Sequence, residues 1–448
     1  MVAVPQERFK MRKIAMLPLA VLLAAVFILG LAAGGWRSDI VSNAKGQESY
    51  EYLRTYAEAL DVVRKNYVDD VKDKDLIYAS IKGVMDSLDP HSYFLTADMY
   101  REMETETKGE FSGIGIGIDM VDGFPAVVTA MEEAPAFKVG VRAGDRIVKI
   151  DGKATGNMRL ADVVGLIRGR KGTQVTLSIM REGFAYPIGF EIRRDVIKVK
   201  SVKFRMLDDD YGYIRITEFQ ERTGEDLETA VKALQKSGSL KGILLDLRSN
   251  PGGLLDQAVD VSDRFLSHGL ITYTEGRAED QRMRFYAHDK DDYLGPLVVL
   301  VNEESASASE IVAGALQDTR RAIIVGTRTF GKGSVQSILP LDGGSAVHLT
   351  TSRYYTPGGR SIQADGIQPD FVVDQDVVRK KGEKPVPMKE KDLDRHLEGT
   401  KERKSGEKKQ NENDRHPNQD RAPKAEEDDF QLAMGLQILK SWGALRGE

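Results

Sequence analysis

The stretch LVVLVNEESASASEIVAGALQDTRRAIIVGTRTFGKG, residues 297–333, decides the fold of this chain. It begins with an apolar run, Leu297 to Val301, which predicts a buried strand. A turn of small residues follows, and apolar residues then recur at helical spacing from Ile311 to Leu316. A second apolar run, Ala322 to Val325, predicts the next strand. Strand, helix and strand in this order are typical of a layered α/β fold.

The same stretch contains three serines in its turn and a lysine at its end. Ser305, Ser307 and Ser309 lie where a strand gives way to a helix, beside backbone N–H groups that stabilise an oxyanion. Lys332 is flanked by glycines and is a candidate to take a serine proton. Because the stretch contains no histidine, it predicts a Ser–Lys dyad rather than a Ser–His–Asp triad.

Each of these residues also has an ordinary structural interpretation. Serine is a good helix N-cap, so at least two of the three serines are structural. A lysine in a turn is usually exposed, and to act as a base at neutral pH its pKa must fall by about three units, which burial can cause. Glu310 and Asp318 are interpreted as helix-face or helix-dipole carboxylates, and a role in orienting the site is the less favoured alternative.

A glycine pair follows another predicted strand. The sequence Arg248 to Gly253 comes directly after the apolar run Gly242 to Leu247. Gly252 and Gly253 would let the backbone approach a ligand closely. At the carboxyl end of a strand in an α/β sheet, such a pair is a candidate oxyanion site. A simple strand-to-helix turn is the alternative.

Residues 111–192 have a different pattern, with short strands separated by glycine-containing turns. The segment Gly113 to Gly117 alternates glycine and isoleucine before a predicted strand. A phosphate loop would need a following helix and a GK[ST] sequence, which are absent here. The pattern fits a backbone nest for a peptide carboxylate, or a plain glycine-rich hairpin.

Composition excludes several classes of function. The chain has 448 residues, room for two or three domains, and a net charge of −5, which gives no electrostatic footprint for nucleic acid. It has no cysteine, which excludes disulfides, thiolate metal sites and a cysteine nucleophile. Its 6 histidines have no ligand-type spacing, so we expect neither a catalytic metal nor a cofactor.

The N-terminus carries a membrane-targeting pattern. Basic residues precede an uncharged run from Ile14 to Trp36, an order that places the N-terminus in the cytoplasm and the rest of the chain across the membrane. The run is about long enough to span a bilayer, which needs roughly 20 residues. A retained anchor is favoured over a cleaved signal peptide, although Leu31 to Gly34 offers residues that a signal peptidase accepts.

Motifs across the chain together resemble the carboxyl-terminal processing (tail-specific) proteases. The resemblance rests on Ser305 to Ala315, Gly326 to Gln336 and the RxNPGG turn. Further motifs extend it: DPHSY at 89–93, YYTPGG at 354–359, and a block from Phe111 to Arg181 similar to a PDZ domain. It covers roughly residues 50–373.

The resemblance assigns roles to particular residues. It implies that Ser307, three residues before Glu310, is the nucleophile, that Lys332 is the general base, and that Gln336 orients this lysine. It implies an oxyanion hole at Ala308 with Gly252 or Gly253. Its implied substrate-binding residues, in the PDZ-like block, are Gly113, Ile114, Gly115, Ile116 and Arg168, the last linking that block to the active site.

Together these patterns predict a multidomain α/β protein with a helical N-terminal module. The resemblance implies an inserted PDZ-like domain and a crotonase-like protease core. The expected divisions are 1–37 (signal or anchor), 45–105 (helical module), 106–192 (PDZ), 200–375 (protease core), 376–428 (charged disordered tail) and 429–448 (amphipathic helix). We expect a serine endopeptidase at the periplasmic face of the inner membrane or in the periplasm of a bacterial envelope, acting on proteins with accessible C-termini. A homo-oligomer or an adaptor protein is a candidate partner. The alternatives are an inactive PDZ-type binding scaffold and an enzyme of acyl-CoA type.

Overall fold

The structure is a computed structural model that describes residues 39–374, 388–399 and 429–442, with gaps at 122, 157, 209, 237, 239 and 290–292. The predicted membrane run lies outside the described residues. Among the residues that are described, no helix is long and apolar enough to cross a bilayer. The chain divides after Ile81 into two compact units.

The first unit is helical. It contains α2 (Asp39–Asn66) and the start of α3 (Asp73–Asp86), which continues into the second unit. The described apolar side chains of α2 face solvent, with Tyr50 70% and Leu53 66% exposed.

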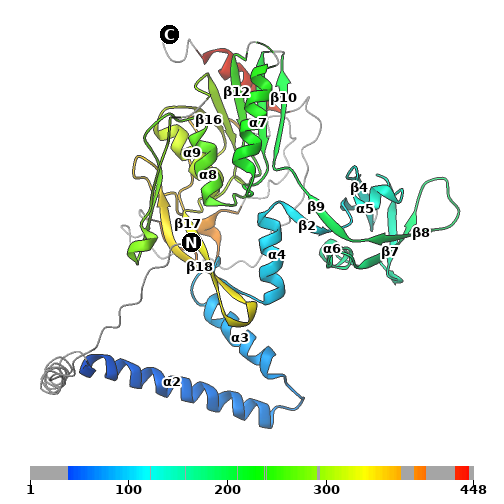
Figure 1. The fold of residues 1–448 in the computed structure, drawn as a ribbon, viewed down its shortest axis with the longest axis vertical. Coiled ribbons are helices and arrows are strands. Elements are labelled where there is room, and N and C mark those ends of the chain that lie inside the picture. Colours follow the sequence, from blue (N-terminus) through cyan, green and yellow to red (C-terminus); the bar gives the residue numbers. More distant parts are fainter. Residues whose placement is uncertain are drawn as a thin grey trace, which may run out of the picture. The chain divides into compact units, whose positions relative to one another are not determined.

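The α/β core of the second unit is built on a six-stranded sheet in the order β10-β11-β12-β15-β16-β19 (Figure 1). Only β10 runs antiparallel to its neighbour, and the other four pairings are parallel. The strands are β10 (Val202–Leu207), β11 (Tyr211–Ile216), β12 (Gly242–Asp246), β15 (Leu297–Val301), β16 (Ile323–Gly326) and β19 (Phe371–Val372).

Alternation along the strands gives the sheet two apolar faces. On one face, Ile243 and Val299 pack against α7 (Thr223–Lys236), α8 (Leu255–Asp263) and α9 (Ala308–Asp318), the helices that Figure 1 shows beside the sheet. On the other face, Leu244 and Val298 pack against the C-terminal helix α11 (Phe430–Lys440). The core is therefore a helix–sheet–helix sandwich, as the alternation of strands and helices predicts.

A buried ion pair holds α11 to the strand β12. The Arg248 guanidinium, just beyond β12, donates to Asp246 at 2.7 Å and to Asp429, the N-cap of α11, at 2.7 Å. All three side chains are largely removed from solvent. Helix α11 therefore docks where the amphipathic pattern near the C-terminus predicts a docking helix.

A second sheet of five strands lies in the same unit. It has the order β1-β18-β13-β14, and β17 pairs with β18. Its strands are β1 (Tyr93–Leu95), β13 (Leu270–Gly276), β14 (Arg284–Tyr286), β17 (Ser334–Pro340) and β18 (Ala346–Tyr355). Short 3-10 turns occur at η1 (Glu279–Gln281) and η2 (Asp342–Gly344).

The block of short strands forms its own sheet and core. The chain enters the block through β2 (Glu110–Gly113) and leaves it through β9 (Asp195–Lys198), and these two strands pair in antiparallel orientation. Because its two ends lie side by side, the block is an insertion. Helix α4 (Ala97–Thr107) precedes it. The remaining elements are β3 (Ile116–Val121), β4 (Phe124–Ala130), α5 (Pro135–Lys138), β5 (Arg146–Ile150), β6 (Lys153–Ala154), α6 (Leu160–Ile167), β7 (Gln174–Met180) and β8 (Ile188–Arg193).

Part of the predicted disordered tail is folded, and the prediction is wrong for residues 388–399. This segment, which we call the strap, contains the 3-10 turn η3 (Glu390–Asp392), and the Glu390 side chain is fully buried. Composition predicts disorder here because large apolar residues are few. The strap is instead held by hydrogen bonds to residues far away in the sequence, such as Gln363.

Candidate active site

Three loops meet at the carboxyl ends of adjacent parallel strands, the edge where α/β sites lie. They are the glycine turn after β12 (248–253), the nucleophile turn after β15 (302–309) and the lysine loop after β16 (327–333). Hydrogen bonds join them, because Ala306 N–H donates to Asn250 O at 3.0 Å and Phe330 N–H donates to Ser305 O at 3.1 Å. The fold therefore brings the predicted serine, lysine and glycines into one place.

The three serines of the nucleophile turn differ in what their hydroxyls do. Ser305 Oγ donates to Leu247 O at 2.8 Å, and Ser309 Oγ donates to Asn250 O at 3.0 Å. Both side chains are fully buried. Ser307 is half-buried, and among the described residues its hydroxyl donates to no backbone carbonyl. Two serines thus fix the turn to the glycine turn, whereas the Ser307 side chain is hydrogen-bonded to the Tyr354 hydroxyl instead.

The backbone of Ser307 is held in an uncommon conformation. It is the N-cap of α9 and has φ 54° and ψ −113°, a positive φ that costs a non-glycine residue energy. The turn is close to Gly252, where an added Cβ would lie 2.7 Å from Ser307 Cβ and 3.0 Å from Ala308 N. Only glycine fits at this approach.

The two turns differ in which N–H groups are free. Gly252 N–H donates to Asn250 Oδ1 at 2.9 Å. For the N–H groups of Gly253 and Ala308, no acceptor is found within the described part of the chain. The free donors beside Ser307 are thus those of Gly253 and Ala308.

Glu310 links the nucleophile turn to the lysine loop. Its Oε2 accepts the N–H of Ser307 at 2.8 Å and the N–H of Lys332 at 2.9 Å. Its Oε1 accepts the Thr329 hydroxyl at 2.5 Å and Gly331 N–H at 2.8 Å. Burial raises the pKa of Glu310 to about 7, against the lowering effect of these four hydrogen bonds. Glu310 lies in the first turn of α9, as expected of a helix-dipole carboxylate, but it is fully buried and holds both loops, which corresponds to the less favoured orienting role.

Lys332 lies in surroundings that favour its neutral form. Burial lowers the pKa of its ammonium below the usual 10.5, and the negative charges of Glu390, Glu310 and Asp89 act in the opposite direction. Within the described residues its ammonium nitrogen makes no hydrogen bond or ion pair. Desolvation without an ionic partner disfavours the charged form, as a lysine base requires.

Tyr354 of β18 lies between the two candidate catalytic residues. Its hydroxyl donates to Lys332 O and lies next to the Ser307 side chain. The side chain is 1% exposed, and burial raises the pKa of the phenol well above 10, so it stays a donor.

Gln336 does not contact Lys332 directly. Its Nε2 donates to Ser334 Oγ at 2.9 Å and to Thr350 Oγ1 at 3.2 Å. Thr350 Oγ1 in turn donates to Asp89 Oδ1 at 3.1 Å, in the DPHSY motif. Gln336 is therefore connected to one of the carboxylates that face Lys332.

The predicted substrate-binding residues lie together in the inserted domain. Gly113, Ile114, Gly115, Ile116 and Arg168 line one groove with α6. The segment Gly113 to Gly117 is interrupted between β2 and β3, because Gly115 has φ 76° and lies against Ala134. The Arg168 guanidinium binds Glu106 of α4 at 3.0 Å, not a residue of the three loops.

Sequence reasoning gave Tyr354 no role and did not favour an orienting role for Glu310. Glu310 carried one usable signal, since it lies three residues after Ser307 and directly before the apolar residues of the helix. Tyr354 carried none by itself, because an aromatic residue in a strand is ordinary core material.

Two sequence families match the chain. Peptidase family S41 matches residues 210–373, and the PDZ domain matches residues 127–181. These matches fall on the protease core and on the inserted domain.

Relatives of known name match over most of their length. The carboxy-terminal-processing protease of Bartonella bacilliformis is 47% identical over 365 residues, which cover 80% of this chain and 84% of that protein. A carboxy-terminal processing protease of Bacillus subtilis is 36% identical over 333 residues, covering 73% and 70%. The solved structure of the photosystem II D1 C-terminal processing protease is 30% identical with a TM-score of 0.45, covering 72% and 87%. The chain therefore belongs to peptidase family S41, as a carboxy-terminal-processing serine protease that carries a PDZ domain.

Proposed function

We propose that Ser307 and Lys332 are the catalytic dyad with which this protease cleaves envelope proteins from their C-termini. One observation carries the assignment: a single carboxylate oxygen, Glu310 Oε2, accepts the backbone N–H groups of both residues, at 2.8 and 2.9 Å. The candidate nucleophile and the buried lysine are thus fixed to a common point.

In the proposed reaction, neutral Lys332 removes the proton of Ser307 Oγ as that oxygen attacks the scissile carbonyl. The lysine, now charged, passes the proton to the leaving amine. Water then attacks the acyl-enzyme and returns the serine. Burial lowers the pKa of Lys332, which supports the first step. Tyr354, bonded to the carbonyl of this lysine, helps to hold the loop in register.

The oxyanion hole is assigned to the N–H groups of Gly253 and Ala308. The resemblance left Gly252 and Gly253 open. Because Gly252 N–H is engaged by Asn250 Oδ1 at 2.9 Å, Gly253 is the better candidate. A donor held by the backbone of a tight turn needs no reorganisation when charge develops on the carbonyl oxygen.

The groove of the PDZ domain is proposed to hold the substrate C-terminus by strand addition along β3. The glycines before β3 and the apolar wall of α6 suit a carboxylate and an apolar last residue. Arg168 would link the binding of a peptide in this groove to α4, through its ion pair with Glu106. Gln336 would orient Lys332 through Thr350 and Asp89.

The uncharged run at residues 14–36 supports an anchor in the inner membrane, with the protease domain in the periplasm. A homo-oligomer or an adaptor would regulate access. Two finer features of the fold belong to the same proposal: a crotonase-like arrangement of the core, and a module formed by the N-terminal helices.

Two alanine variants test the dyad. Ser307→Ala and Lys332→Ala should each lose activity on a substrate with an apolar C-terminus, by at least about a thousandfold, and keep the unfolding transition of the parent. An acylating serine probe should label the parent chain and not Ser307→Ala. Turnover retained by Lys332→Ala would contradict the assignment.

A further inference from the structure

The strap, residues 388–399, lies against the lysine loop. Glu390 N–H donates to Phe330 O at 3.3 Å, two residues before Lys332. At the other end of the strap, Leu397 O accepts the side-chain amide of Gln363 at 2.9 Å. A segment that composition predicts to be disordered is therefore attached to the loop that carries the proposed base.

Glu390 is the buried residue of this contact. Its side chain is 0% exposed, although its neighbours Lys391 and Asp392 are exposed. Its two oxygens lie 2.9 and 2.8 Å from His91 Nε2, and Oε1 accepts Gln363 Nε2 at 2.9 Å. A carboxylate is buried at a high desolvation cost unless it is paired, so these partners account for its position.

Gln363 transmits this contact to the lysine loop. The amide that donates to Glu390 also accepts, through Oε1, the N–H of Gly333 at 2.9 Å. The next residue, Ala364, donates its N–H to Gly331 O at 2.8 Å. Both glycines that flank Lys332 are thus fixed from the side opposite Glu310.

His91 connects Glu390 to Gln336. The backbone N–H of His91 donates to Asp89 Oδ1 at 2.9 Å, and the same oxygen accepts the Thr350 hydroxyl at 3.1 Å. Thr350 accepts Gln336 Nε2 at 3.2 Å. Glu390 therefore joins two chains of hydrogen bonds, one to Gln336 and one to the flanking glycines of Lys332.

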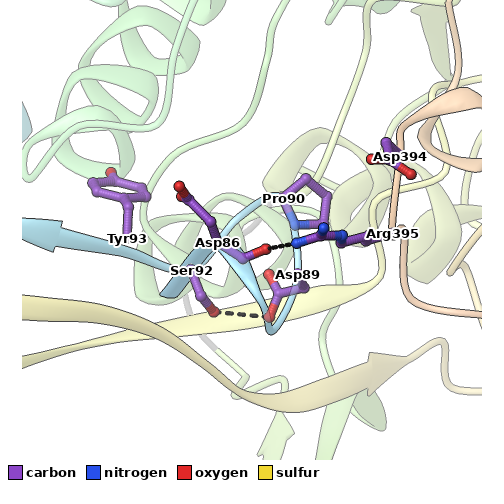
Figure 2. A pocket seen from close by; sticks show the side chains of 7 residues that line it. All are labelled: Asp86, Asp89, Pro90, Ser92, Tyr93, Asp394 and Arg395. Atoms are coloured by element: carbon purple, nitrogen blue, oxygen red, sulfur yellow. Dashed lines mark hydrogen bonds between the residues drawn. The ribbon is translucent and has the colours of Figure 1, made fainter. Parts of the chain in front are cut away.

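Figure 2 shows the strap beside the DPHSY turn. A small cavity there is lined by the strap residues Asp394 and Arg395 and by residues of the turn, among them Asp89 and Ser92. The Arg395 guanidinium donates to Asp86 O, and Ser92 Oγ donates to Asp89 at 2.8 Å. The strap is thus fastened to this turn as well as to the lysine loop.

We propose that the strap is part of the active-site framework and that Glu390 is a positioning residue, which holds the loop that carries Lys332. This role rests on the proposed function, because the position of Lys332 affects catalysis only if Lys332 is the general base. The DPHSY motif gains a role in the same proposal, since His91 is the partner of Glu390.

The negative charge of Glu390 predicts a change in the pH dependence of activity, which a residue that only packs would not cause. The titratable groups that face Lys332 are the carboxylates of Glu390, Glu310 and Asp89, the imidazole of His348 and the phenol of Tyr354. The Glu390 charge favours the protonated lysine. Removing that charge should therefore let Lys332 lose its proton at lower pH.

The test compares three variants of the full-length chain: Glu390→Ala, Glu390→Gln and the matched control Glu398→Ala, an exposed glutamate of the same strap. Hydrogen–deuterium exchange of residues 329–334 should be faster in Glu390→Ala by roughly tenfold or more, with kcat lowered by a similar factor and KM nearly unchanged. Glu390→Gln, which keeps one acceptor, should recover part of both losses. In Glu390→Gln, the increase of kcat with pH should occur at lower pH than in the parent. Glu398→Ala should match the parent in exchange, kcat and pH profile.

Two results would overturn the proposal. One is exchange in residues 329–334 that is the same in Glu390→Ala and Glu398→Ala. The other is a Glu390→Gln variant whose pH profile coincides with that of the parent. If Glu390→Ala does not fold, Glu390→Gln decides by both measurements. If the parent chain has no proteolytic activity, the proposed function fails, and the exchange comparison still judges whether Glu390 holds the loop.

Discussion

The nucleophile turn and the lysine loop carry the two halves of the proposed dyad, but they are held in different ways. The nucleophile turn is fixed by short hydrogen bonds to the adjacent glycine turn, such as Ser309 Oγ to Asn250 O at 3.0 Å. The lysine loop is fixed by the side chains of Glu310 and Gln363 and by the backbone N–H of the strap residue Glu390, which come from three separate segments.

The difference shows where each half is vulnerable. The serine takes its position from two turns at neighbouring strand ends, so a change within those turns should disturb it. The position of the lysine depends on contacts made across the whole core, so substitutions far from Lys332 in sequence should weaken catalysis. Glu310 is the exception that joins the two regions, since it binds both backbones.

The largest effect is expected where the two turns touch. In Gly252→Ala the new Cβ would lie 2.7 Å from Ser307 Cβ and 2.9 Å from Ala306 O, at φ 109°. Displacing the nucleophile by about 1 Å should lower kcat/KM by roughly a hundredfold or more, because near-attack geometry is lost. Strain and overpacking together should lower the free energy of unfolding by roughly 2 to 4 kcal/mol in denaturant titrations.

Gly269→Ala is the matched control, because Gly269 has φ 100° and no atom within 4 Å of an added Cβ. It should show the backbone strain without the loss of activity. Equal activity losses in the two variants would mean that contact with Ser307 is not the cause.

A change at Glu310 should disturb both regions at once. In Glu310→Gln the amide NH2 replaces one oxygen, so two N–H or O–H donors lose their acceptor. Each unsatisfied buried donor costs roughly 1 to 3 kcal/mol, so the loss of two should lower kcat by roughly thirtyfold or more. Steady-state kinetics would show this with little change in KM. A variant of parental activity would contradict the role of Glu310 as the common anchor.

The sequence was sufficient to propose the dyad, but it did not identify the side chains that hold the dyad in place. Ser307, Lys332 and the glycine pair lie in contiguous motifs at strand ends, which pattern and resemblance identify. The contact between His91 and Glu390 joins residues 299 positions apart, and no local periodicity reports it. Gly253 could be chosen over Gly252 only once the structure showed the hydrogen bond from Gly252 N–H to Asn250 Oδ1. The interruption at Gly115 likewise became visible only from the positive φ of that residue.

The pH dependence of stability should report the burial of Glu310. Its pKa is raised from 4.5 to about 7 on folding, so between these values the folded chain holds a proton that the unfolded chain releases. The free energy of unfolding should therefore fall, on account of this group, by about 3 kcal/mol as pH rises through that window. Denaturant titrations of the parent and Glu310→Gln should differ in this slope. Parallel curves would argue against the raised pKa.

A smaller effect is expected at a serine that only supports the turn. Ser305→Ala removes the hydrogen bonds to Leu247 O and from Asn302 N–H. The free energy of unfolding should fall by roughly 1 to 3 kcal/mol, because buried groups lose their partners. Labelling by an acylating probe should persist, which separates this serine from Ser307. Loss of labelling in a folded Ser305→Ala chain would contradict the assignment of Ser305 as a structural serine.

The most direct test of the proposed dyad is the rate at which an acylating probe modifies Ser307 as a function of pH, followed by intact mass. The rate should rise with pH, first as Glu310 loses its proton near pH 7 and then as Lys332, whose pKa burial lowers below the usual 10.5, loses its own. In Lys332→Ala the acylation should be slower by at least about a hundredfold throughout and lose the later part of the rise. Acylation of Lys332→Ala at the parental rate, with the parental pH dependence, would show that Lys332 is not the base.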